Sequence, residues 1–165
     1  MDVTIEAMRA TDAPAVLAIL AEGIAAGTAT FETEVPTGDA WSAAHLEAGR
    51  LVARDPAGAV VGWTALGPVS ARAVYRGVAE VSVYVAAHAR GHGVGRALLR
   101  ALIEASEAAG MWTLQTSVFP ANRASLALLR SVGFREVGVR ERIGQHGDEW
   151  RDTVLLERRS QRVGR

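Results

Sequence analysis

A glycine-rich turn between an apolar strand and an amphipathic helix is the feature that most limits how this chain can fold. The segment Arg90–Arg96 reads Arg-Gly-His-Gly-Val-Gly-Arg. Glycine adopts positive φ readily and lets backbone N–H groups approach a ligand closely. The following helix adds unpaired first-turn N–H groups and the positive end of its dipole. The segment therefore predicts a phosphate-holding turn, to which Arg90, His92 and Arg96 add positive charge.

Two kinds of nucleotide site use similar glycines, but the sequence lacks the other parts of both. The strand expected over Thr113–Val118 runs into Phe119-Pro120, not into the acidic residue that binds ribose in dinucleotide sites. No Gly-Lys-Ser/Thr follows the glycines, so a Walker loop is absent as well. A turn that simply joins a strand to a helix is the alternative that the glycines alone leave open.

Length and composition favour one domain. The 165 residues, of which 49% are hydrophobic, suit a single domain over 1–165 with a polar tail from about 159 to 165. The formal net charge is zero and the charges are interspersed, so we expect neither a nucleic-acid partner nor a membrane surface. No run reaches the roughly 18 apolar residues of a membrane span, and the start does not resemble a signal peptide. These features predict a cytoplasmic protein.

The residue types also restrict the chemistry. Cysteine is absent, which excludes disulfides, thiolate metal sites and a cysteine nucleophile. The four histidines lack His-Glu-x-x-His spacing, and no Gly-x-Ser-x-Gly elbow occurs. We therefore expect no metal site and no serine-hydrolase site.

Hydrophobic periodicity predicts alternating strands and helices. A turn at Asp55–Gly58 indicates an antiparallel hairpin, and the central strand–helix–strand unit requires a parallel, right-handed crossover. The predicted strands are 3–7, 51–54, 59–66, 79–85, 113–118, 134–139 and 150–157. The predicted helices cover 13–22, 41–48, 94–109 and 122–131.

The ordered motifs resemble the GNAT superfamily of acetyl-CoA-dependent N-acetyltransferases. The phosphate-binding motif of that superfamily, Arg/Gln-x-x-Gly-x-Gly/Ala, corresponds to Arg90–Gly95. Its second signature, an Asn that opens a helix ending in Gly-Phe, corresponds to Asn122 and Gly133-Phe134. The resemblance implies an α/β (α+β) fold: a mixed, mostly antiparallel sheet of about seven strands, with a central parallel β-α-β unit and flanking helices. It also implies acetyl-CoA as co-substrate.

Within that superfamily, four stretches are similar to the phosphinothricin and methionine sulfone/sulfoximine acetyltransferases. They are Gly27–Glu34, Gly67–Tyr75, Ala79–Val85 and the Trp-x-Asp ending at Trp150–Asp152. This similarity implies that the acceptor is the α-amine of a small amino-acid-like compound. It further implies a homodimer and a role in resistance to herbicides or antibiotics that inhibit glutamine synthetase.

The resemblance also assigns residues to acetyl-CoA. The glycine turn would hold the pyrophosphate, and Val83–Val85 would offer backbone hydrogen bonds to the pantetheine arm. Asn122 would bond to the same molecule, although a helix N-cap alone would explain an Asn at that position. The predicted acetyl-CoA-binding residues are Val83, Tyr84, Val85, Arg90, Gly91, His92, Gly93, Val94, Gly95, Arg96, Asn122, Ser125 and Ser131.

Glu80 is the predicted general base, acting directly or through water. A carboxylate in an apolar strand is costly to bury, and desolvation would raise its pKa into a useful range. An ion pair of Glu80 with Arg72 or Arg76 is the structural alternative. We expect Arg72 to bind the acceptor carboxylate through its planar fork, beside Tyr75, and Phe31 to close the acceptor pocket.

Leu129 departs from the family pattern, because many members have Tyr, and this subgroup often His, at that position. Leucine cannot donate a proton. A thiol with an ordinary pKa near 8.5 can leave without a dedicated acid, or with assistance from water or Tyr84. His146 is a second candidate, with a surface role as its alternative. The open functional alternatives are acetylation of another small amine or a peptide N-terminus, and a non-catalytic acyl-CoA sensor.

Overall fold

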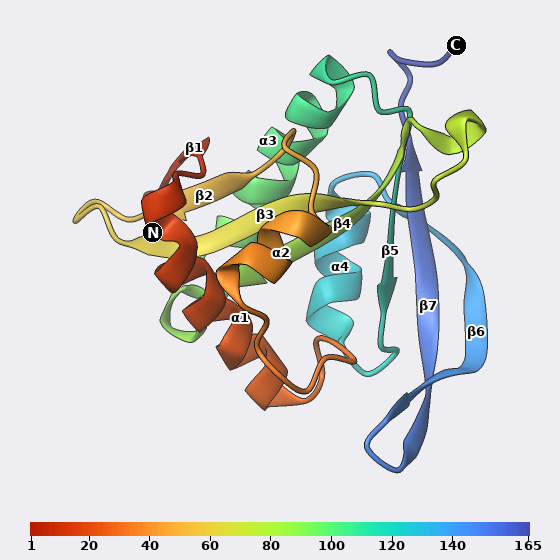
Figure 1. Cartoon of the computed structure of the whole chain (residues 1–165), viewed down its shortest axis with the longest axis horizontal. Helices are drawn as coiled ribbons and strands as arrows, with labels where there is room; N and C mark the ends of the chain where they lie inside the picture. Colours follow the sequence, from red (N-terminus) through yellow and green to blue (C-terminus); the bar gives the residue numbers. More distant parts are fainter.

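Seven strands form one sheet in the computed structural model, which describes residues 1–165 (Figure 1). Their order is β1-β2-β3-β4-β5-β7-β6, and only β4 and β5 run parallel. This arrangement confirms the predicted mixed, mostly antiparallel sheet with one central parallel pair. The strands are β1 (Thr4–Ala7), β2 (Leu51–Arg54), β3 (Val60–Pro68), β4 (Val78–Val85), β5 (Thr113–Val118), β6 (Arg135–His146) and β7 (Glu149–Arg159).

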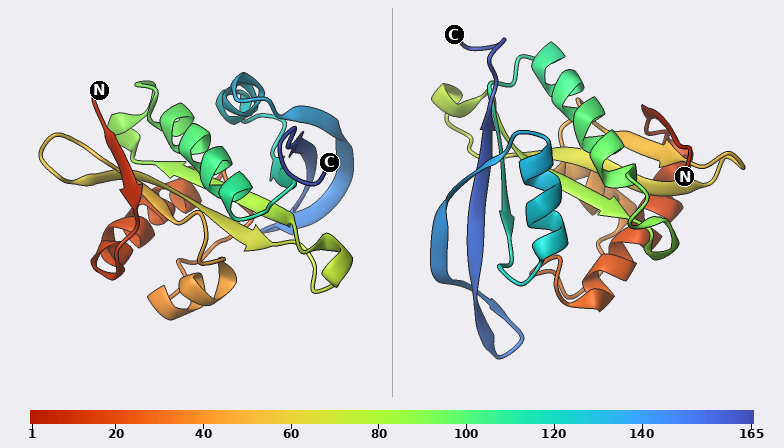
Figure 2. Two further views of the ribbon diagram at one scale, coloured as in Figure 1. Left: turned by 90° about the horizontal axis from the view of Figure 1, so that it is seen from above. Right: turned by 180° about the vertical axis from the view of Figure 1, so that it is seen from behind.

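Helices cover both faces of the sheet, as Figure 2 shows from two directions. The first two helices pack on one face, and the last two cover the other. They are α1 (Ala13–Ala26), α2 (Gly38–Ala44), α3 (Val94–Ala108) and α4 (Arg123–Ser131). Short 3-10 turns lie at Ala10–Asp12, Ala73–Tyr75 and Ala87–Ala89.

The first helix continues one turn beyond its predicted end because Gly23 has a packing role. A Cβ on Gly23 would lie 2.7 Å from the ring of Tyr84, so only glycine lets α1 approach β4 this closely. On this face Trp63 stacks on Tyr84, with ring centroids 5.0 Å apart, and meets Trp41 edge to face at 5.3 Å. Tertiary packing therefore outweighs the poor helix propensity of glycine.

The other face carries the larger core. The amphipathic character predicted for the helix after the glycine turn is confirmed, because Val94, Leu98 and Leu102 form an apolar stripe on α3 that is almost fully buried against the sheet. β6 also differs from its prediction, running to His146 rather than Val139. Two register shifts interrupt its pairing with β7, so its side chains lose the simple alternation by which a strand is recognised in sequence.

β4 and β5 separate soon after they meet. They pair only over Val78–Glu80 and Thr113–Gln115, whereas β3 pairs with the other edge of β4 as far as Val85. The edge of β4 that faces β5 therefore has no strand partner from Val81 onward. Its backbone N–H and C=O groups need other partners, which makes this gap the natural place for a bound chain.

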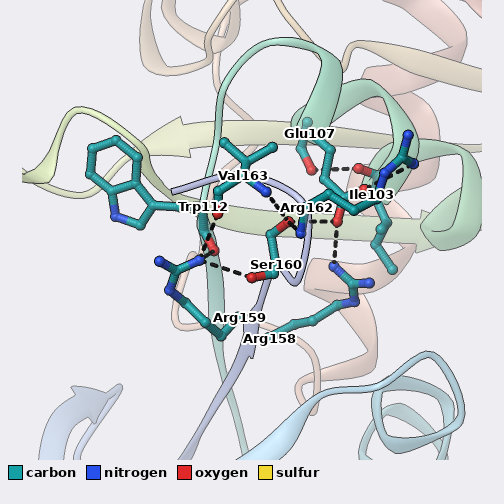
Figure 3. Close-up of polar contacts among 9 residues, drawn as sticks. Ile103, Glu107, Trp112, Arg158, Arg159, Ser160, Arg162 and Val163 are labelled. Carbon is teal, nitrogen blue, oxygen red and sulfur yellow. Dashed lines mark hydrogen bonds and ion pairs between the residues drawn. The ribbon is translucent and has the colours of Figure 1, made fainter. Parts of the chain in front are cut away.

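The C-terminal tail is fastened to α3 through Glu107 (Figure 3). Ser160 Oγ donates to Glu107 Oε1 at 2.9 Å, and Arg158 Nη1 donates to the same oxygen at 3.2 Å. Arg162 adds an ion pair at 3.5 Å. The Glu107 side chain is only 8% exposed. Burial by itself would raise the pKa of Glu107, but these three donors more than offset burial and hold the pKa below its usual value.

Replacing Glu107 by Gln is expected to lower the free energy of unfolding by about 1–3 kcal/mol at neutral pH, because the Arg158 and Ser160 donors lose a charged acceptor. The native carboxylate has a lowered pKa, so its contribution is complete above the unfolded-state value of about 4.3. It is lost as the pH falls through the folded-state pKa of Glu107. Urea unfolding of both proteins across the acid range measures this difference.

Glu104→Gln is the matched control, since Glu104 is exposed on the same helix and makes no ion pair. We expect the control to unfold like the wild type at every pH. Equal destabilisation by both variants, or a Glu107 effect that grows in acid, would contradict the proposed fastening.

Candidate active site

Two cavities adjoin at the gap between β4 and β5. The glycine-loop cavity, of about 430 Å³, lies beside the turn before α3, and the strand-gap cavity, of about 290 Å³, lies beside β4, β5 and the α1–α2 loop. The two cavities have six lining residues in common: Ala29, Val83, Tyr84, Asn122, Ser125 and Leu128. A molecule that occupies the first cavity can therefore present one end to a molecule in the second.

The glycine-loop cavity gathers most of the residues predicted to bind acetyl-CoA. Its lining includes Val83, Tyr84, Val85, Arg90, Gly91, Gly93, Val94, Gly95, Arg96, Asn122 and Ser125. His92 is exposed and does not line it, and neither does Ser131. Ser131 Oγ instead accepts a hydrogen bond from Arg96 Nε at 3.3 Å, so Ser131 helps to hold a guanidinium at the cavity wall.

Backbone geometry explains why this turn needs its glycines. Gly91 and Gly93 have φ of 77° and 82°, in the left-handed region that side chains with a Cβ disfavour. Gly93 is also the N-cap residue of α3, so the unpaired first-turn N–H groups of that helix follow directly. Gly95 serves packing, because a Cβ there would lie 2.9 Å from Leu128 of α4. The result is a cavity wall suited to an anion.

The side chain of Asn122 joins α4 to the α1–α2 loop. Its Oδ1 accepts from the backbone N–H of Ser125 at 3.2 Å, which makes Asn122 the N-cap residue of α4. Its Nδ2 donates to the carbonyl of Thr28 at 3.3 Å, in the α1–α2 loop. The capping alternative is therefore present in the structure, while the role of Asn122 toward a cofactor stays a prediction.

Glu80 lines the strand-gap cavity at the last residue pair before β4 and β5 separate. The expectation that it is buried was wrong, because the Glu80 side chain is exposed. It pairs with neither Arg72 nor Arg76, so the structural alternative of an ion pair is not seen either. The apolar sequence around Glu80 indicated burial, but the strands diverge there and open that position to solvent.

Arg72 and Tyr75 lie apart from both cavities. The Arg72 guanidinium sits 5.6 Å from the centre of the Tyr75 ring, and both side chains are exposed in and beside the short turn before β4. Neither residue lines the cavity that contains Glu80. Their proposed contact with an acceptor stays a prediction, and it places the acceptor carboxylate outside the strand gap.

Phe31, predicted to close the acceptor pocket, does line the strand-gap cavity. Its ring meets Phe119 edge to face at 4.8 Å, and a Cβ on Gly144 would lie 2.7 Å from it. Arg151 adds a second attachment, because its Nη1 donates to the carbonyl of Gly27 at 2.7 Å. The α1–α2 loop is thus held against the β6–β7 hairpin.

Sequence reasoning missed Glu32 and Thr153, which line the strand-gap cavity. It also missed Arg151, which does not line the cavity but bonds to the α1–α2 loop. Thr153 is 3% exposed, and its Oγ1 has no hydrogen-bond partner. A signal existed for Glu32, which directly follows Phe31 in a stretch that resembles the subgroup. No such signal existed for Thr153 or Arg151, apart from their position next to Trp150 and Asp152.

Leu129 and Tyr84 bear on proton transfer. Leu129 lines the strand-gap cavity and presents an apolar side chain there. Tyr84 lines both cavities. Burial raises the pKa of Tyr84, although the Thr30 side chain partly offsets this effect, so its phenol keeps its proton at neutral pH. His146 lines neither cavity; its ring lies 6.5 Å from that of Phe119.

Comparison with known proteins shows that this chain is similar to N-acetyltransferases. The acetyltransferase (GNAT) family profile matches residues 9–134. The chain is 35% identical to L-methionine sulfoximine/L-methionine sulfone acetyltransferase of Pseudomonas paraeruginosa, over 95% of this chain and 94% of that protein. It is 40% identical to phosphinothricin N-acetyltransferase of Alcaligenes faecalis, over 94% and 81% of the two chains.

A solved structure agrees with the fold. The GNAT superfamily phosphinothricin acetyltransferase of Sinorhizobium meliloti, crystallised with acetyl-CoA, superposes with a TM-score of 0.86 and is 29% identical. The match covers 96% of this chain and 89% of that one. None of the helices described above is both long enough and apolar enough to cross a membrane.

Proposed function

This chain belongs to the acetyltransferase (GNAT) family and is an N-acetyltransferase; we propose that it acetylates the α-amine of a small amino-acid-like compound. The acceptors would be of the phosphinothricin, methionine sulfone or methionine sulfoximine type, which the names of its relatives specify. One observation carries the proposal: the cavity lined by the glycine turn, Arg90 and Arg96 meets a cavity with a free carboxylate, Glu80, at the open edge of β4.

The residues of the glycine-loop cavity fit acetyl-CoA. Left-handed Gly91 and Gly93, the start of α3 and the side chains of Arg90 and Arg96 would hold its pyrophosphate. The edge of β4 at Val83–Val85 has no strand partner and would hydrogen-bond its amide-containing arm, beside the Val85 carbonyl that already accepts from Arg90 Nε at 3.0 Å. Bound there, acetyl-CoA supplies a thioester carbonyl at the junction with the strand-gap cavity.

Transfer forms a bond between the acceptor nitrogen and the acetyl carbon and breaks the carbon–sulfur bond. Glu80 would take the first of the two protons that the ammonium loses, directly or through one water, and the exposure of Glu80 gives water access to it. The second proton leaves the nitrogen once the nitrogen is bonded to the acetyl carbon, and it can pass to the departing sulfur. Leu129 has no proton to give to the departing sulfur. Tyr84, which lines both cavities, would supply a proton or a hydrogen bond there, and the ordinary thiol pKa near 8.5 keeps that demand small.

The subgroup resemblance extends the proposal to a homodimer. Its support in this chain is the set of large apolar side chains exposed on β6 and β7, namely Val137, Val139, Ile143 and Trp150. Isolated exposed apolar residues are ordinary, but a group on one edge hairpin is typical of a surface that is covered in an assembly.

Thiol release from acetyl-CoA, measured with a panel of acceptors, tests the proposed function. The panel contains phosphinothricin, methionine sulfone, methionine sulfoximine, simple amines and a short peptide. We expect turnover with at least one of the first three. Turnover of only the peptide or only the simple amines would show that the acceptor belongs to that class instead. Tight acetyl-CoA binding without turnover of any acceptor would favour an acyl-CoA sensor.

Replacing Arg72 by Ala is expected to raise KM for an amino-acid acceptor about tenfold with little change in kcat, because a hydrogen-bonded charge pair is lost in ground state and transition state alike. Arg72→Lys should recover only part of this, since lysine cannot form the bidentate contact. Steady-state kinetics with methionine sulfone and its methyl ester measure the effect. The ester lacks the carboxylate, so its KM should be the same with wild type and Arg72→Ala. An equal rise in KM for both acceptors would show that Arg72 does not bind the carboxylate.

A further inference from the structure

The strand-gap cavity carries negative charge that nothing in its lining balances. Glu32 comes from the α1–α2 loop and Glu80 from β4, and neither makes an ion pair. No Lys, Arg or His lines this cavity. An acceptor enters it beside two unpaired carboxylates, so its charge must matter for binding.

The polar side-chain atoms of the lining are almost all oxygens. Asn122 is the only lining residue with nitrogen in its side chain, and its Nδ2 already donates to Thr28. The remaining polar side chains are carboxylates and hydroxyls. Carboxylates accept hydrogen bonds only, whereas an ammonium group has three donors and no acceptor. The two carboxylates therefore favour a cationic ligand with ammonium donors, while the hydroxyls of the lining can both donate and accept.

Thr153 independently points to a ligand in the same cavity. It is 3% exposed, and its Oγ1 has no hydrogen-bond partner in the chain. A buried hydroxyl without a partner costs about 1–3 kcal/mol unless something else bonds to it. A donor group bound in the strand gap would satisfy it.

Glu32 is held in place rather than free on a long loop. Its backbone N–H donates to Thr30 Oγ1 at 3.1 Å. The preceding residue, Phe31, is packed between Phe119 and Gly144. The Glu32 side chain lines the strand-gap cavity, where Tyr84 also lies.

We propose that this enzyme also acetylates small amines that carry a second positive charge, and that Glu32 binds their distal ammonium. The proposal rests on acetyl transfer at this same site and adds an acceptor class to it. The reacting ammonium gives one proton to Glu80, and the nitrogen bonds to the acetyl carbon as the carbon–sulfur bond breaks; the second proton of that nitrogen passes to the departing thiolate, which leaves as a thiol. The distal nitrogen keeps its three protons and donates to Glu32. Arg72 is not needed, because it lies outside the cavity and such acceptors have no carboxylate.

The test compares diaminobutane with butylamine, a matched monoamine, at neutral pH where both diamine nitrogens are protonated. The measured quantity is the ratio of their kcat/KM values. We expect the wild type to prefer the diamine, and Glu32→Gln to reduce that preference about tenfold, which is the scale of one hydrogen bond to a charged group. A thermal unfolding curve checks that the variant remains folded.

Glu34→Gln is the control variant. It removes the same charge from the same loop, but Glu34 is exposed and lines neither cavity. The diamine preference should survive in this variant. Equal efficiency of diamine and monoamine with wild type, or equal loss of preference in both variants, would overturn the proposal. Turnover of no amine at all would instead overturn the proposed function.

Discussion

Replacement of Glu80 by Gln is expected to lower kcat about 10²- to 10⁴-fold at neutral pH, the usual contribution of a positioned general base. Gln keeps the shape of the side chain but cannot take a proton. Because Glu80 is exposed and makes no ion pair, its loss should leave the fold and its thermal stability unchanged. Thiol release with a saturating acceptor, together with a thermal unfolding curve, measures both quantities.

The pH dependence distinguishes proton transfer from simple attraction of the acceptor. An α-amine has an unperturbed pKa of about 8, so more of the acceptor arrives already neutral as the pH rises. The deficit of Glu80→Gln should therefore narrow in alkaline solution. A loss that appears only in KM, or activity within a few-fold of wild type at neutral pH, would remove Glu80 from the chemistry and leave it at most a binding residue.

The exposure of Glu80 also shows where sequence reasoning about the fold ends. Local signals sufficed for the hairpin at Asp55–Gly58, for the stripe of α3 and for β5, whose observed bounds equal the predicted ones. Whether a residue of β4 is covered depends on how far β5 stays beside it. That distance is set by packing of helices and by the β7 strand on the far side of β5, which no local pattern records.

The two cavities differ in how much of them the sequence could predict. The glycine-loop cavity is built largely from one continuous segment after β4, so its motif predicted most of its lining. The strand-gap cavity is assembled from the α1–α2 loop, β4, β5, α4 and β7. Glu32 reaches it because Phe31 packs on Gly144, a contact between distant parts of the chain. Its charge therefore became visible only in three dimensions.

Replacing Gly93 by Val is expected to raise KM for acetyl-CoA about 10- to 100-fold, which corresponds to the roughly 1–3 kcal/mol cost of forcing a side chain into a left-handed backbone conformation. The Gly93 Cβ would meet no atom within 4 Å, so the cost is conformational rather than steric. The turn can relieve this conformational cost only by changing φ at residue 93. That change would move the N–H groups at the start of α3 away from the position proposed for the pyrophosphate. Initial rates at varied acetyl-CoA concentration, with kcat largely retained at saturation, would show the effect.

Gly110→Val separates cofactor binding from general destabilisation. Gly110 follows the other end of α3, has φ of 84°, and likewise has open space where a Cβ would be built. It lines neither cavity. Both variants should therefore lose comparable stability, but only Gly93→Val should raise KM for acetyl-CoA. If KM for acetyl-CoA rose equally in both, the turn would be a structural joint between β4 and α3, which is the alternative that the glycines alone leave open. If only Gly93→Val raised it, the left-handed turn would be acting on the pyrophosphate itself.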